Sequence, residues 1–305
     1  MMTMAVIDTG LLTKGLRSEF FDRLNATPVL YRDLSTRVAS NSDRETYRWL
    51  GTVPKMREWG SGRLTQGLRT ESYSVENLKY EATIEVDRDE LADDQTGQIR
   101  IRVGELARRA ALHKDFLISQ LLALGTSTGL SYDGVSFFSD NHVSGASGAQ
   151  SNKVEAPAGN PQIPVAEDFK VALQMAIGRM LSFKDDQGEP MMVDAGGLAC
   201  VVPPGLYFVA IDAIQARVIG NRSNVMEGVA RVVAMPWLTG TTWYLLKTDG
   251  VIRPFIFQDR EPVEFTALTG DSDEGFRREK YLYGVRARYR MTYGYWQHAL
   301  RVTFA

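Results

Sequence analysis

The chain has little of what most enzymes and secreted proteins depend on. It contains one cysteine and three histidines in 305 residues, so an internal disulfide is excluded and a reducing compartment suits it. The cysteine, Cys200, lies in the apolar run 198–202, where we expect a small buried side chain rather than a reactive thiol. No run approaches the roughly 20 apolar residues of a membrane helix, and the start lacks a secretory signal pattern. These absences predict a soluble cytosolic protein with no membrane partner.

Catalytic and cofactor motifs are absent as well. The chain has no His-x-x-x-His or Cys-x-x-Cys pair, no Gly-x-Ser-x-Gly elbow and no phosphate-binding loop. Two acidic clusters, 87–94 and 271–275, could suggest cation sites, but the first suits the start of a helix and the second a solvated turn. We therefore predict no enzyme activity, no metal and no cofactor.

The charge balance excludes a general affinity for nucleic acid. Lys and Arg number 35 against 37 acidic residues, so any contact with nucleic acid has to be local. The apolar content of 44% is ample for a substantial core, in one large or two smaller domains.

What the chain does contain is an alternating strand followed by a long helix. Apolar and polar residues alternate over 78–86, which predicts a strand with one wet face. Asp87 and Glu90 then form a capping-box pattern at a helix start. From Ile99 to Leu124 the apolar residues recur at helical spacings, up to Gly125. This pattern predicts a spine helix roughly 40 Å long, at about 1.5 Å per residue.

The segment before this strand is rich in glycine and arginine and carries two tryptophans. One interpretation is a surface loop whose rings fold back on their own domain. The other is an arm whose tryptophans are buried by a neighbouring subunit, because Trp and Arg are enriched at the centres of interfaces. His113 interrupts the apolar series of the spine helix, so we expect it to be packed or to face a partner. The candidate contact residues are Trp49, Pro54, Arg57, Trp59, Arg63, Arg69 and His113.

The rest of the chain reads as a mixture of helices and strands. Local patterns predict helices at 11–24, 167–183 and 206–218, strands at 198–202, 229–235, 241–247 and 251–258, and a loop over 144–164. Asp249 and Gly250 suggest a hairpin turn. A long strand from Tyr283 changes the phase of its alternation near Gly294, which predicts a bulge or bend there. Its opposite face carries three arginines that could meet phosphates or acidic partners: Arg286, Arg288 and Arg290.

Taken in order, these segments resemble the major head proteins of Mu-type tailed phages and related prophages. The resemblance is spread over most of the chain. It is carried by Tyr47, Trp49, Leu50, Gly51, Pro54, Glu58 and Trp59, by 87–90, by Tyr132, Asp133, Gly134, Phe137 and Phe138, by 253–258, and by Tyr283, Gly284, Tyr293, Gly294, Trp296 and Gln297.

The resemblance implies an α+β protein of the Hong Kong 97-like capsid fold. Its parts would be an N-terminal arm, an extended β-hairpin loop, a peripheral domain with the spine helix and the loop after it, an axial domain, and C-terminal strands that return to the peripheral domain. The corresponding ranges are 1–45, 46–86, 87–165, 166–250 and 251–305.

The resemblance also implies a function. Hexamers and pentamers of this major capsid protein would assemble in the bacterial host cytoplasm into the icosahedral head shell of a virion, around double-stranded DNA bound without sequence specificity. A separate scaffold, a separate maturation protease and a portal at one vertex would be partners, and a decoration protein is left open. No crosslinking Lys and Asn pair can be placed by motif. The alternatives are an encapsulin-like compartment and an α+β hydrolase or binding module.

Overall fold

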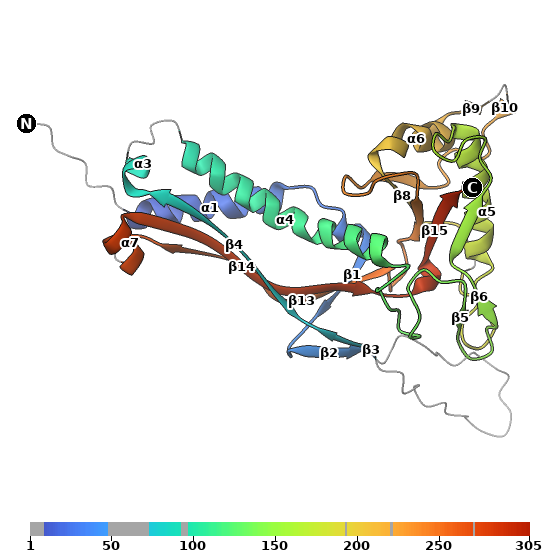
Figure 1. The fold of residues 1–305 in the computed structure, drawn as a ribbon, viewed down its shortest axis with the longest axis horizontal. Coiled ribbons are helices and arrows are strands. Elements are labelled where there is room, and N and C mark those ends of the chain that lie inside the picture. The colour runs from blue at the N-terminus through green and yellow to red at the C-terminus, as the bar shows by residue number, and fades with distance from the viewer. Residues whose placement is uncertain (1–8, 48–72, 93–96, 193, 220–221, 271) are drawn as a thin grey trace, which may run out of the picture.

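The chain folds into two lobes of different shape. The computed structural model describes residues 9–47, 73–92, 97–192, 194–219, 222–270 and 272–305. Figure 1 shows a long lobe, in which α1 and α4 lie along a narrow twisted sheet, and a compact lobe, in which α5 and α6 pack against a second sheet. The prediction of a mixed α+β fold is confirmed.

The sheet of the long lobe is built on one extended hairpin. Its strands follow the order β1-β13-β14-β4, with β1 at Ser35–Ala39, β13 at Phe255–Leu268, β14 at Lys280–Tyr293 and β4 at Leu78–Asp87. The hairpin β13–β14 is closed by α7, Asp273–Arg278. Among the described strands β4 pairs with β14 alone, so it is the outer strand of this sheet. The strand expected over 78–86 is confirmed.

Helix α4, Gln98–Leu124, is the predicted spine helix. It buries a stripe at helical spacing against β14 and against α1, Thr9–Ala26, whose Leu16 and Phe20 enter the same core. The short α2, Tyr31–Leu34, is tied to α4 by Asp115. This buried carboxylate accepts hydrogen bonds from the backbone N–H groups of Leu30 (2.9 Å) and Tyr31 (2.7 Å). The bonds satisfy donors that a helix start leaves free.

The compact lobe has a sheet of order β11-β8-β12-β15-β7 covered by two helices. All five side chains of β8 are buried, including Cys200, as predicted. The stretch Pro204–Leu206 forms one turn of 3-10 helix, which starts α6. The bounds are Arg231–Ala234 (β11), Leu198–Val202 (β8), Trp243–Lys247 (β12), Ala299–Phe304 (β15), Lys153–Ala156 (β7), Ala166–Leu181 (α5) and Tyr207–Gln215 (α6).

Short elements complete the chain. Two-residue strands form the pairs β5–β6 and β9–β10, and β2 pairs with β3 beside the long sheet. Their bounds are His142–Val143 (β5), Ala149–Gln150 (β6), Val218–Ile219 (β9), Arg222–Ser223 (β10), Arg44–Tyr47 (β2) and Tyr73–Glu76 (β3), and α3 spans Arg88–Ala92. In the parts of the chain that the structure describes, no helix combines the length and apolar character needed to cross a membrane.

Two local predictions are wrong. Asp249–Gly250 is not a hairpin turn, because β12 and β13 belong to different sheets. The range 144–164 is not all loop, since β7 pairs in parallel with β15. At Gly294, where a bulge or bend was expected, β14 has just ended, and the 3-10 turn Trp296–His298 leads into the other sheet. A side chain at Gly294 would meet the carbonyl oxygen of Arg253 at 2.4 Å, so glycine is required.

The two lobes meet around a buried histidine, His142. Its Nδ1 lies 2.6 Å from Asp133 Oδ2 and its Nε2 lies 3.2 Å from Asn152 Oδ1. The Asn152 amide nitrogen donates to the carbonyls of Phe137 and Trp296, so the amide oxygen faces the imidazole. The His142 ring stacks on Trp296 at 4.0 Å between centroids and 7° between planes. We call these residues the junction cluster.

Candidate subunit-contact surface

An open groove separates the spine helix from the outer strand of the long sheet. This α4–β4 groove has a volume of about 640 Å³. The inward-facing side chains of β4, Tyr80, Ala82 and Ile84, line one side, and Leu106 and Ala110 of α4 line the other. Helix α4 lies mainly over β14 and leaves part of β4 uncovered, so Ala82 is exposed and Ile84 is half-buried. The groove therefore has apolar walls that this chain does not fill.

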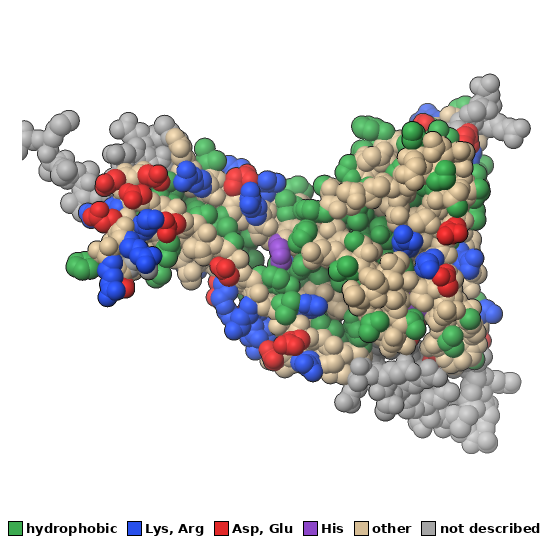
Figure 2. Space-filling view, viewed as in Figure 1, with side chains coloured by type: hydrophobic (Ala, Val, Ile, Leu, Met, Phe, Trp, Pro, Cys, Tyr) green, Lys and Arg blue, Asp and Glu red, His purple; other side chains and the backbone are tan. Residues whose placement is uncertain are grey.

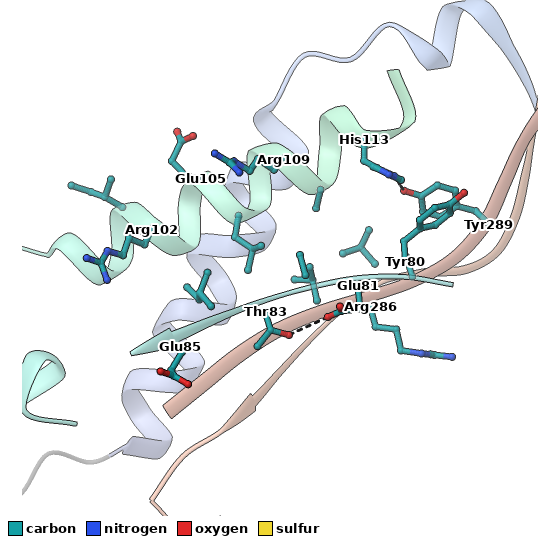
Figure 3. Close-up of a pocket in the computed structure, with 18 residues that line it drawn as sticks. Tyr80, Glu81, Thr83, Glu85, Arg102, Glu105, Arg109, His113, Arg286 and Tyr289 are labelled. Carbon is teal, nitrogen blue, oxygen red and sulfur yellow. Dashed lines mark hydrogen bonds between the residues drawn. The ribbon is translucent and has the colours of Figure 1, made fainter. Parts of the chain in front are cut away.

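Three rings close one end of the groove. Figure 3 shows Tyr80, His113 and Tyr289 gathered there, and the other labelled α4 residues spread along the helix. His113 Nδ1 lies 2.7 Å from the Tyr289 hydroxyl, and the centroids of Tyr80 and His113 are 4.6 Å apart. Burial and the neighbouring Lys114 lower the pKa of His113, so the ring is neutral at pH 7. His113 is thus packed within its own chain, which is one of the two roles predicted for it.

Charged residues of both signs stand along the rim. On α4, Arg102 approaches Glu90 at 4.0 Å, while Arg109 is exposed and has no carboxylate within 4.0 Å among the residues described. On β4, Glu81 and Glu85 alternate with the apolar positions. An apolar floor between a helix that presents the exposed Arg109 and a strand that carries exposed glutamates is suited to a polypeptide that carries tryptophan and arginine.

The outer strand adds a second binding feature. The edge of β4 that faces away from β14 pairs with no other strand in the described part of the chain. Such an edge presents backbone N–H and C=O groups that another strand can pair with. The exposed glutamates and Lys79 on this strand guard it against indiscriminate pairing, as charged residues on edges generally do.

A second apolar surface lies on the compact lobe. Figure 2 shows apolar side chains gathered over the α6 end of this lobe, and charged side chains of both signs at the far end of the long lobe. Phe208 of α6 is 78% exposed, and Val218 and Val225 around the β9–β10 pair are 61% and 77% exposed. Asn224 holds this region in place through side-chain bonds to the carbonyls of Ala213 and Ala216, at 2.8 Å each. Exposed apolar residues on a well-fixed scaffold mark a contact surface.

The structure resolves one question about the C-terminal arginines. Arg286 and Arg288 both pair with Glu261 of the adjacent strand, at 2.6 and 3.0 Å, and Arg288 also reaches Asp43 at 3.0 Å. Acidic partners, rather than phosphates, therefore occupy these two side chains. Among the residues that the structure places, no three His, Cys, Asp or Glu side chains gather as metal ligands.

Most predicted contact residues lie outside the described residues. This applies to Trp49, Pro54, Arg57, Trp59, Arg63 and Arg69, so their role stays a prediction. The groove residues Tyr80, Ala82 and Arg109 were not predicted. The alternation over 78–86 contained a signal for Tyr80 and Ala82, since a strand with one wet face beside a long helix is only partly covered. The pattern did not show which side of the strand the helix would cover.

Comparison with known proteins decides the family. The model of the family described as Mu-like prophage major head subunit gpT matches residues 10–164 and 239–304. The chain belongs to this family. It is 26% identical over 287 residues to the major capsid protein of Escherichia phage Mu, covering 94% of this chain and 70% of that protein. The Mu-like head subunit is therefore a structural capsid protein of a tailed phage and not an enzyme, as predicted.

Solved structures agree with this assignment. A chain of the procapsid of bacteriophage JBD30 is 26% identical to the head subunit, with a TM-score of 0.58, covering 96% of this chain and 74% of that one. A chain of the mature capsid of bacteriophage PhiM1 is 11% identical, with a TM-score of 0.59 and coverage of 91% and 87%, which shows the shared fold alone. The Hong Kong 97-like capsid fold is confirmed, and the compartment and hydrolase alternatives are not favoured.

Proposed function

We propose that this head subunit assembles as hexamers and pentamers into an icosahedral shell around double-stranded DNA, and that the part of the loop 46–86 between β2 and β3 lies in the α4–β4 groove of a neighbouring subunit. Assembly takes place in the bacterial host cytoplasm, with a separate scaffold, a separate maturation protease and a portal at one vertex. The observation that carries the loop contact is the open groove, which has apolar walls and an unpaired strand edge.

The two ends of the loop support this contact. Strands β2 and β3 pair Tyr47 with Tyr73, so the ends of the segment between them lie side by side. A path out and back through this segment would have about a dozen residues in each direction and would reach at most about 40 Å when extended. This reach matches the length of α4, so the loop can cover a neighbour's spine helix from end to end. Trp49 and Trp59 would fill the groove and cover its apolar walls.

The expected axial domain, 166–250, would meet its copies around the capsomer axis. The exposed Phe208, Val218 and Val225 support this part of the proposal, because a hexamer or pentamer would cover them. The remaining assigned ranges stay predictions in the same scheme, from the arm at 1–45 to the strands at 251–305, of which β13 and β14 return to the long lobe while β15 joins the sheet of the compact lobe.

A crosslinking experiment tests the loop contact directly. Arg57→Cys subunits are mixed with Ala82→Cys subunits during assembly and oxidised. Cys200 is buried and its pKa is raised by burial, so it does not compete. We expect disulfide dimers that need both variants. As a matched control, Ile163→Cys, which is 71% exposed and outside the groove, should give none with Arg57→Cys.

Assembly itself is tested by analytical ultracentrifugation and electron microscopy. Trp59→Ala and Ile101→Asp should leave the subunit folded and impair assembly, because Ile101 is 66% exposed in the groove and not part of the core. Ile163→Asp should assemble normally. Normal particles from both groove variants would refute the loop contact, and a wild-type protein that stays strictly monomeric would refute the shell.

A further inference from the structure

A second cavity, on the α1–α2 side of the spine helix, carries an excess of positive charge. It has a volume of about 800 Å³ and lies among the end of α1, α2, β1, α4 and β13. Figure 1 shows the connection from α1 to β1 running beside α4 at this place. Of the described residues, four cations line it, Arg32, Arg37, Lys114 and Arg253, and one carboxylate, Asp259. The lining thus has a net charge of +3, in a chain whose net charge is −2.

Among the residues that the structure describes, a carboxylate neutralises one of the four cations. Asp259 accepts hydrogen bonds from Arg37, at 2.7 and 2.9 Å. The guanidinium of Arg253 donates to the backbone carbonyl of Arg32, which fixes its position without cancelling its charge. Within the described ranges, no carboxylate lies within 4.0 Å of Arg32, Lys114 or Arg253. Three positive charges therefore remain available to an anionic ligand.

Lys114 is the most constrained of these cations. Its Nζ lies 5.1, 5.2 and 4.9 Å from the ring centroids of Tyr31, Phe257 and Tyr289. Aromatic faces attract an ammonium group but supply no counter-charge. The adjacent Asp115 already accepts two backbone N–H groups. Burial lowers the pKa of Lys114, and an anion in the cavity would act in the opposite direction by favouring its charged form.

The chemistry of the lining selects a phosphate group. Guanidinium forks match the oxygens of phosphate, and an ammonium group adds a point charge. The rings of Tyr31 and Phe257 already hold Lys114, so they are not free to stack on bases. The other lining residues include Val251, Pro262 and Val263, which cannot read base edges, and Ser35 and Thr36, whose hydroxyls already donate to backbone carbonyls of this chain; Asn25 is the remaining polar side chain. A site of this kind binds a nucleic acid backbone and ignores its sequence.

We propose that this cationic cavity binds the phosphodiester backbone of duplex DNA. The proposal rests on the proposed function in one respect, since a head shell brings the subunit into contact with packaged DNA. The duplex lies across the mouth of the cavity, and one stretch of backbone enters it. Arg32, Lys114 and Arg253 make the ionic contacts, while Arg37 stays paired with Asp259.

The test uses unassembled full-length subunits and two fluorescently labelled DNA duplexes of unrelated sequence. Fluorescence anisotropy over a range of salt concentrations should give equal affinities for both duplexes. Three contacts predict a slope of log K against log salt of about −2.7, at about −0.9 per phosphate. Arg32→Gln should weaken binding about eightfold at about 0.1 M salt and reduce the slope by about one. Lys114→Met should act in the same direction.

The control is Arg277→Gln, on α7 at the far end of the long lobe, where an exposed arginine pairs with Asp273 at 2.9 Å. It should bind DNA like the wild type. Unchanged binding by Arg32→Gln and Lys114→Met, with unchanged unfolding midpoints, would overturn the proposal. So would a preference for one duplex, or displacement of DNA by polyglutamate at lower concentrations than by inorganic polyphosphate, because the site would then take an acidic protein segment.

The same variants separate this proposal from the proposed function. Ultracentrifugation of Arg32→Gln should show particles of normal size, because Arg32 lines the cationic cavity and not the α4–β4 groove. Normal shells with unchanged DNA binding would remove the phosphate site and leave the shell intact. DNA binding by a protein that never assembles would support the phosphate site and refute the shell.

Discussion

Replacing His142 with alanine should loosen the joint between the two lobes. The imidazole is fully buried, and the carboxylate that it faces, Asp133, is 4% exposed. The substitution leaves this carboxylate without its 2.6 Å partner and removes the ring stacked on Trp296. Breaking a buried pair by removing one member costs about 3–5 kcal/mol, since the remaining group stays desolvated. We expect a loss of this size in the free energy of unfolding.

Urea unfolding of unassembled subunits, followed by circular dichroism, measures this loss. A double-mutant cycle then tests whether this loss of stability comes from the contact between His142 and Asp133. Asp133→Asn removes the charge that His142→Ala would strand, so the double variant should be more stable than the sum of the two single losses predicts, by at least about 1.5 kcal/mol. A cost of His142→Ala below about 1 kcal/mol, or single losses that add within about 0.5 kcal/mol, would refute the account of the junction cluster.

Three further predictions concern stability and pH. Gly129→Ala should lower the melting temperature and cost about 1–3 kcal/mol, because the new Cβ would lie 2.1 Å from the hydroxyl of Tyr293, a buried side chain. Asp115→Ala should cost about 2–4 kcal/mol in urea unfolding, since two backbone N–H groups lose their acceptor, whereas Asp115→Asn should cost less. Burial lowers the pKa of His298 and of His113, so the unfolded chain binds more protons and stability should fall as the pH drops below about 6.5. His298→Gln should make this fall shallower, and equal unfolding midpoints at pH 7.5 and 5.5 in the wild type would contradict it.

The sequence predicted the elements whose signal is local. The apolar spacing from Ile99 to Leu124 defined α4 almost to the residue, and the alternation over 78–86 defined β4. Strand β8 and helix α5 were also found, because each has a continuous apolar run or a single apolar face. In these segments burial follows the period of the element, so the pattern alone is enough.

Pairing between distant segments could not be predicted in the same way. Asp249 and Gly250 have the chemistry of a hairpin turn, but turn chemistry does not say which strand each neighbour will pair with. Here β12 pairs with β8 and β15, while β13 pairs with β1 and β14. The role of His142 depends on Asp133, Asn152 and Trp296, which its own neighbours in sequence do not reveal.

The connections between the lobes have a mechanical consequence. The chain passes from one lobe to the other three times: after α4, between β12 and β13, and between β14 and β15. Three chain connections at one place restrict rotation of one lobe relative to the other, whereas a single connection would allow it. The long hairpin β13–β14 has register shifts at Asp259, Glu261 and Glu264 and is only one sheet thick. We therefore expect a strained subunit to bend along the hairpin β13–β14, while the angle between the two lobes at their junction stays unchanged.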